Sequence, residues 1–119
     1  MTVNAPVSDI AAQYTSSSLL AMSSNYEGFP MVMIEAMSCG LPVVTFDYKC
    51  GPRDIITPEV NGLIVPNGDI QAFADALVRV MTHTEMRRDM GRAALAVTER
   101  YSLETVMKSW NNLFEKLHA

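Results

Sequence analysis

The chain has 119 residues, of which 49% are hydrophobic and 18% charged, a composition typical of one small globular domain and not of a disordered segment. Its net charge of -4 argues against nonspecific binding to nucleic acid or to an anionic membrane. Only two of the nine basic residues, Lys49 and Arg53, precede Asn67, so the first half of the chain holds few cations that could bind a phosphate.

The first forty residues predict a short helix, a strand and a second helix. We expect the first helix over Asp9–Tyr14, with Ser8 as its cap. The apolar run Leu19–Met22 predicts a buried strand. A helix is then expected over Pro30–Ser38, because proline at the first helical position and glycine just past the end, here Gly40, are typical helix boundaries.

Two more strands are predicted before residue 67. Pro42–Phe46 is apolar and rich in β-branched residues, which favours a second buried strand. Asp54–Ile56 predicts one helical turn, and the dipeptide Asn61-Gly62 predicts a turn that leads into a third strand over Leu63–Val65.

Helices are predicted for the remainder of the chain. They begin near Asp69, Thr84 and Ser102, of which Asp69 and Ser102 are expected caps. Their expected buried faces, at steps of three and four residues, are Phe73, Leu77, Val80 and Met81; Met86, Met90, Ala94 and Val97; and Val106, Trp110, Leu113 and Leu117.

Strands that alternate with helices predict an α/β fold with a parallel sheet and right-handed crossovers. About three strands are visible, where a doubly wound sheet usually has five or six, so we expect a three-layer Rossmann-like half sheet with flanking helices and a helical C-terminus. Residues 1–119 are expected to form a single domain. Such a half sheet has an exposed edge strand, which predicts possible self-association.

Two carboxylates, Glu27 and Glu35, have seven residues between them. Glu27 falls in the loop after a predicted strand, and Glu35 falls inside an otherwise apolar helix. Burying a carboxylate without a partner is costly, so Glu35 either lies on an exposed stripe of its helix or points into a cleft where a ligand's hydroxyls donate to it.

The predicted topology favours the ligand. In open parallel sheets, ligands bind beyond the carboxyl ends of the strands, where Ser23–Phe29 is expected. The next helix offers free backbone amides and the positive end of its dipole, which suits a phosphate. Gly28 lets a ligand approach the backbone closely. These features predict a ligand that has both a phosphate and a polyol.

The segment Glu27–Glu35 resembles the E-x7-E motif of the retaining glycosyltransferases of family 4, the group 1 glycosyltransferases. The flanking stretch Glu35–Val44, EAMSCGLPVV, is similar to a stretch that follows the motif in that family. Three further segments also fall where the family has similar residues: Gly51–Ile56, Asn61–Val65 and Tyr101-Ser102. The resemblance runs from about Val7 onward and implies the C-terminal part of the C-terminal domain of a GT-B enzyme.

The resemblance also implies roles for the matching positions. Glu35 would bind the ribose hydroxyls of a donor nucleotide, and Glu27 would act as the catalytic residue that contacts the transferred sugar. Gly28, Phe29 and Pro30 would shape the sugar pocket, while the amides of Met31 and Val32 would face the diphosphate. The implied reaction transfers a sugar from a nucleotide-diphosphate donor to an acceptor hydroxyl with retention, without a metal or other cofactor.

One departure from the family is the lack of a basic pair before Lys49, since the family's pair that neutralises the diphosphate lies upstream of this segment. The domain that would bind the acceptor, a glycan or a lipid-linked sugar, also has no counterpart. Leaving-group charge must be stabilised for fast transfer, so we expect the chain alone to have little or no transferase activity and to be a fragment of a longer protein.

Several alternatives stay open at this point. A non-catalytic interaction module could keep the same fold, and a flavodoxin-like or receiver domain is a third possibility, although no acidic cluster follows a first strand. Arg53 either reaches a phosphate or sugar or is a solvated turn residue, and Asp47 either faces the ligand or caps its strand. Arg87, Arg88 and Arg92 alternate with acids as on a solvated helix face, and His83 and His118 are expected at the surface.

The two cysteines, Cys39 and Cys50, do not have a zinc or redox spacing, and we expect reduced thiols. Met1–Tyr14 has no basic region followed by an apolar run, so no signal peptide is expected. No stretch approaches the roughly 20 apolar residues of a membrane span. A cytoplasmic location is therefore expected, and a peripheral position at the inner membrane stays open for the full-length enzyme.

Overall fold

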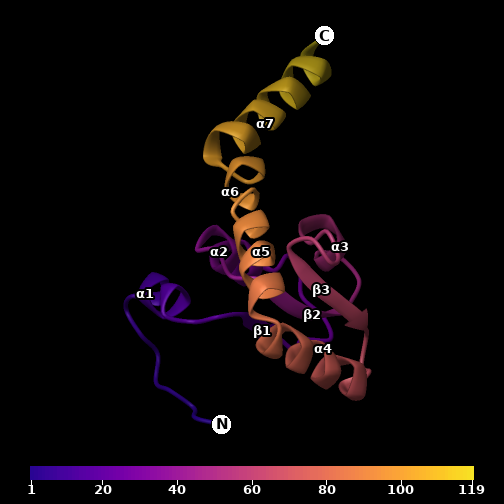
Figure 1. The fold of residues 1–119 in the computed structure, drawn as a ribbon. Helices are drawn as coiled ribbons and strands as arrows, with labels where there is room; N and C mark the ends of the chain where they lie inside the picture. Colours follow the sequence, from indigo (N-terminus) through magenta and orange to yellow (C-terminus); the bar gives the residue numbers. More distant parts are fainter.

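A computed structural model describes residues 1–119. Its centre is a parallel sheet of three strands in the order β1 (Leu20–Met22), β2 (Val43–Asp47) and β3 (Gly62–Pro66) (Figure 1). Leu20 lies opposite Val43, which in turn lies opposite Gly62. The expected parallel half sheet is confirmed, with strand boundaries that differ from the predicted ones by one residue.

Seven helices accompany the sheet, and the chain ends in the longest of them. Their bounds are α1 (Ile10–Thr15), α2 (Met31–Ser38), α3 (Pro52–Ile55), α4 (Ile70–Thr82), α5 (Thr84–Ala94), α6 (Val97–Arg100) and α7 (Leu103–His118). Helix α4 packs along β2 and β3, whereas α2 packs against β2 and against α5 and α6. The helices after β3 therefore return across the sheet to the helix that follows β1.

The core is centred on the middle strand, which is buried from Val43 to Phe46. Met33 and Met37 of α2, Val80 of α4 and Met90 of α5 are at most 1% exposed and join the same cluster. The flexible thioethers fill the irregular space between helices and sheet. This packing holds α2 in a defined position against β2.

Local capping explains where the helices begin. The Asp69 carboxylate accepts from the amide of Ala72 at 2.9 Å, and the Ser102 hydroxyl accepts from the amide of Thr105 at 3.2 Å, which confirms both predicted caps. The predicted cap Ser8 is wrong, because Asp9 accepts from the amide of Ala12 at 3.0 Å and α1 begins one residue later than expected.

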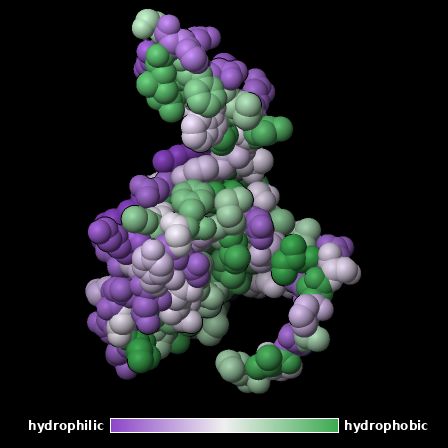
Figure 2. All heavy atoms as spheres, turned by 180° about the vertical axis from the view of Figure 1, so that it is seen from behind, coloured by the Kyte–Doolittle hydropathy of each residue, from purple (hydrophilic) through white to green (hydrophobic).

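Two predictions about buried faces are wrong. Met81 is 55% exposed, and Ala76 takes its place on the buried side of α4. Helix α7 buries none of its residues, although Val106, Trp110, Leu113 and Leu117 were expected to face inward. It extends away from the sheet, and its apolar side chains lie on the surface (Figures 1 and 2). Amphipathic periodicity predicts that a helix has an apolar face but does not identify what covers it.

No helix of the chain combines the length and the apolar character needed to cross a lipid bilayer.

Candidate functional site

The loops that follow the three strands meet at the carboxyl edge of the sheet. The loop after β1, Ser23–Phe29, is here named the β1–α2 loop. The side-chain amide of Asn67, just after β3, donates to the carbonyl of Asn25 in this loop at 3.4 Å. The loop after β2 reaches the same place, because the backbone of Gly51 lies directly against the ring of Pro30. The edge is thus built by all three strands.

Glu27 lies within the β1–α2 loop and is half-buried. Its Oε1 accepts from the hydroxyl of Ser24 at 2.8 Å. Its second oxygen, Oε2, has no hydrogen-bond donor in the chain. One side of the carboxylate is therefore oriented by the protein, and the other is available.

Glu35 lies on the exposed side of α2, one turn beyond the helix start. Its Oε2 accepts from the hydroxyl of Tyr14 at 3.2 Å. Tyr14 is buried, and burial, followed by the negative charge of Glu35, raises the pKa of Tyr14, so this hydroxyl stays protonated and donates. The carboxylate is exposed in this chain, yet α1 fixes its direction.

Tyr14 was not anticipated from the sequence. It lies 21 residues before Glu35, and no local pattern signals the contact. Only the packing of α1 against α2 brings the two side chains together.

The start of α2 leaves a backbone donor free. Pro30 precedes the first helical residue and provides no side-chain cap. The amide of Met31 donates to the carbonyl of Phe29 at 2.9 Å, whereas the amide of Val32 has no partner in the chain. Of the two amides predicted to face a diphosphate, that of Val32 is the one available, and it lies at the positive end of the helix dipole.

Apolar side chains surround this helix start. Phe29, Met31 and Val32 are 47%, 55% and 44% exposed. The ring of Phe29 packs against Tyr101 with centroids 5.9 Å apart, and the hydroxyl of Tyr101 donates to the carbonyl of Asp54 at 3.2 Å. The segment before α7 thus supports the β1–α2 loop from one side.

Gly28 contributes open space. A Cβ atom placed there would meet no other atom within 4 Å, so packing inside this chain does not require a glycine at that position. The absence of a side chain leaves room directly beside Glu27.

Arg53 and Asp47 form an ion pair at the same edge. The Nε and Nη2 atoms of Arg53 donate to the two carboxylate oxygens of Asp47, at 2.9 and 2.6 Å. The hydrogen bond and then the charge of Asp47 raise the pKa of Arg53. The arginine is 70% exposed at its side chain, so it is a paired surface cation close to the end of β2.

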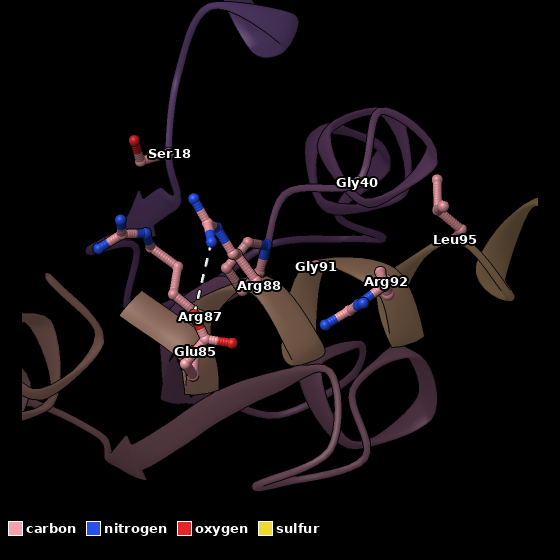
Figure 3. Close-up of a pocket in the computed structure, with 9 residues that line it drawn as sticks. Ser18, Gly40, Glu85, Arg87, Arg88, Gly91, Arg92 and Leu95 are labelled. Atoms are coloured by element: carbon pink, nitrogen blue, oxygen red, sulfur yellow. Dashed lines mark hydrogen bonds and ion pairs between the residues drawn. The ribbon is translucent and has the colours of Figure 1, made fainter. Parts of the chain in front are cut away.

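A hollow of the surface lies away from these residues. It measures about 620 Å³ and lies at the amino ends of the strands, between Ser18, Pro42 and helix α5 (Figure 3). Neither Glu27 nor Glu35 lines it. Arg87, Arg88 and Arg92 all contribute to it, but each is engaged: with the carbonyl of Met81 at 2.7 Å, with Glu85 at 3.4 Å, and with Asp89. These contacts agree with the solvated helix face expected for the three arginines.

The two histidines do not contribute to the carboxyl edge. His83 is exposed at the junction of α4 and α5, and His118 is exposed at the end of α7. Both are surface residues, as predicted.

Fold and site define a class of protein, the GT-B glycosyltransferases with an E-x7-E motif in the C-terminal domain. Comparison with known families agrees: the family described as glycosyl transferases group 1 matches residues 1–97. The chain belongs to this family.

Three related proteins illustrate the match. The chain is 35% identical over 108 residues to the amylovoran biosynthesis glycosyltransferase AmsD of Erwinia amylovora, covering 91% of the chain and 30% of AmsD. It is 37% identical over 97 residues to a poly(ribitol-phosphate) alpha-N-acetylglucosaminyltransferase of Staphylococcus aureus, covering 81% of the chain and 20% of that enzyme. The structure of Anabaena HepE in complex with UDP superposes with a TM-score of 0.85 at 25% identity, over 92% of the chain and 30% of HepE.

The chain therefore spans less than a third of each of these relatives. The matched portion includes the whole sheet, the β1–α2 loop and α2, since the family match ends at Val97.

Proposed function

We propose that this chain is the donor-binding part of a retaining glycosyltransferase, which transfers a sugar from a nucleotide diphosphate to an acceptor hydroxyl. One observation carries the proposal: the free amide of Val32 and the carboxylates of Glu27 and Glu35 all belong to the loop and helix at the carboxyl edge of the sheet. A nucleotide sugar presents a diphosphate between two polyols, which suits a donor group flanked by two acceptors.

Each part of the ligand then has a partner. The diphosphate lies over the start of α2, where the Val32 amide and the helix dipole stabilise negative charge. Glu35 accepts from the ribose hydroxyls, in an orientation held by Tyr14. Glu27 approaches the transferred sugar from the β1–α2 loop, and the space beside Gly28 accommodates the sugar ring. HepE, whose structures hold UDP and UDP-glucose, supports a nucleotide-sugar ligand by similarity.

Transfer needs groups that this chain lacks. The departing diphosphate requires cations, and Arg53, which follows β2 at this edge, is already paired with Asp47. We propose that residues 1–119 bind the donor as one domain, that the remainder of a complete enzyme supplies the cations and the acceptor site, and that no metal participates. The isolated chain is then expected to show little or no turnover, in a cytoplasmic enzyme that uses a glycan or lipid-linked acceptor.

The test is a titration of the chain with UDP, GDP and ADP, followed by amide NMR and calorimetry. We expect at least one nucleotide to bind in the millimolar range or tighter and to shift the amide signals of Gly28–Glu35. Glu35→Gln should weaken that binding on the order of tenfold, because it loses hydrogen bonds to a charged acceptor. Glu115→Gln, an exposed residue on α7, is the matched control and should bind like the wild type.

The outcomes separate the alternatives. Silence at high nucleotide concentration, or shifts confined to residues outside the β1–α2 loop and α2, would support the non-catalytic interaction module instead. Robust turnover of nucleotide sugars by the chain alone would overturn the expectation that the fragment is inactive. Unchanged binding in the presence of EDTA is expected for a metal-free site.

A further inference from the structure

Tyr48 stands out among the residues at the carboxyl edge. It directly follows β2 and is only 3% exposed. Its hydroxyl is the one buried side-chain polar atom of the chain that lacks a hydrogen-bond partner. Buried hydroxyls are almost always paired, because an unpaired one loses its bonds to water without replacement. The Tyr48 hydroxyl therefore needs a hydrogen-bond acceptor that this conformation does not provide.

The neighbourhood of the hydroxyl contains a matching acceptor. Burial is the main cause that raises the pKa of Tyr48, and the negative charge of Glu27 raises it further, so the hydroxyl stays protonated within the field of that carboxylate. The Thr45 side chain lowers the pKa of Tyr48, but the Thr45 hydroxyl itself donates to the carbonyl of Phe46 at 3.3 Å. Glu27 uses Oε1 for Ser24 and leaves Oε2 without a donor.

An unused donor and an unused acceptor oxygen thus follow two neighbouring parallel strands, β2 and β1, at the same edge of the sheet, and the acceptor is on an exposed loop. The β1–α2 loop belongs to no helix or strand, and five of its seven residues are exposed. Gly28 has open space around it, so the loop meets no packing obstacle there. Pairing of the two groups requires Glu27 to move inward.

We propose that Tyr48 is the positioning residue for Glu27: when a nucleotide sugar occupies the site, the Tyr48 hydroxyl donates to Oε2 of Glu27 and holds the carboxylate toward the transferred sugar. This inference rests on the proposed function, since it needs a sugar to draw the loop inward. The hydroxyl is too deeply buried to touch the sugar itself, so its effect passes through Glu27.

The contribution of Tyr48 to ligand affinity then depends on the sugar and not on the nucleotide. The Glu35 side of the site recognises the nucleotide whether or not a sugar is attached. A variant that lacks the Tyr48 hydroxyl should therefore bind the free nucleotide normally and lose part of the additional affinity that the sugar provides. A purely structural role of Tyr48 would weaken both ligands alike.

The test compares UDP with UDP-glucose, UDP-galactose, UDP-N-acetylglucosamine and, paired with GDP, GDP-mannose on the 119-residue chain. For the sugar that binds tightest, the ratio of its affinity to that of its nucleotide is measured for wild type, Tyr48→Phe, Glu27→Gln and the double variant. We expect Tyr48→Phe to lower this ratio about tenfold, and the double variant to be no worse than Glu27→Gln alone. A Tyr48 hydroxyl proton protected from exchange should appear with the sugar and be absent with the nucleotide alone.

Tyr14→Phe is the comparison variant. It removes a tyrosine hydroxyl from the other glutamate, so it should weaken nucleotide and nucleotide sugar by the same factor and leave the ratio unchanged. Thermal unfolding of Tyr48→Phe should show no loss of stability, because the variant removes an unpaired buried group. An unchanged ratio in Tyr48→Phe, or equal weakening of both ligands, overturns the inference while the proposed function stands. Failure of wild type to bind any of these ligands overturns both.

Discussion

Replacing Gly51 with alanine tests whether the two loops at the carboxyl edge are held together by close backbone packing. Gly51 has φ +124° and ψ -62°, a conformation that residues with a Cβ rarely adopt. A Cβ atom there would lie 2.5 Å from Cδ and 2.9 Å from Cγ of Pro30. Pro30 directly precedes α2, and its ring cannot rotate away as a flexible side chain would. Relief of the clash must move the start of α2 or the loop after β2.

The expected loss of unfolding free energy in Gly51→Ala combines two destabilising effects and one stabilising effect. The unfavourable backbone conformation costs about 1–3 kcal/mol. Overpacking against the proline ring adds about 1–3 kcal/mol. The smaller entropy of alanine in the unfolded chain offsets about 0.4–1 kcal/mol. Gly51→Ala should therefore reduce the free energy of unfolding by about 2–5 kcal/mol, a drop of the midpoint temperature of roughly 8–20 °C for a domain of this size.

Gly68→Ala is the matched control. Gly68 also has a positive φ, +80°, but a Cβ atom there would meet nothing within 4 Å. It should cost about 1 kcal/mol, the price of the left-handed conformation alone. Thermal unfolding followed by circular dichroism measures both variants, and titration with the nucleotide that binds wild type measures the site. Equal midpoints for the two variants, or normal nucleotide binding by Gly51→Ala, would refute the packing argument.

Three further predictions concern stability and self-association. Met90 is 1% exposed, so Met90→Ala should cost about 2–5 kcal/mol in urea unfolding, whereas Leu113→Ala on the uncovered face of α7 should stay within about 0.5 kcal/mol; equal losses would contradict the exposed position of α7. The hydrogen bond from Arg79 lowers the pKa of Glu59, so the pair stabilises the fold above about pH 4.5 and loses this effect as the pH falls through the lower folded-state value. The difference in unfolding free energy between wild type and Glu59→Gln should accordingly narrow as the pH falls below 4.5. The difference is small at any pH because both side chains are about half exposed, and a difference that does not narrow as the pH falls would argue against the ion pair. Trp110→Lys should reduce self-association of the chain in sedimentation, since Trp110 stacks on Phe114 on the same exposed face; an unchanged profile would leave the sheet edge as the predicted contact.

Much of the fold could be predicted because its signals are local. The caps Asp69 and Ser102 act on amides three residues away, and the apolar runs of β2 and β3 reflect strands that are mostly buried. The same locality explains the error at Ser8, where two neighbouring residues could cap one helix and only the backbone geometry selects Asp9. For the same reason, the apolar face of α7 could be predicted from its periodicity, whereas the exposure of that face could not.

In the candidate site, too, local features could be predicted and contacts between distant residues could not. Glu27 and Glu35 could be proposed from their spacing and flanks, and their placement on a loop and the following helix agrees with that proposal. Their partners could not be proposed. Tyr14 lies 21 residues from Glu35 in the sequence, and nothing around Tyr48 indicates that its hydroxyl would be buried without a hydrogen-bond partner.

By itself, the sequence determined the order of the elements, the parallel sheet and the two glutamates, since these depend on residue type, spacing and hydrogen bonds between near neighbours. Only the tertiary structure decided which groups complete the environment of each glutamate, that Arg53 is neutralised by Asp47, and that Gly51 must remain a glycine because Pro30 lies against it. Contacts of this kind depend on how elements distant in the chain pack together, and their energies leave no periodic trace in the sequence.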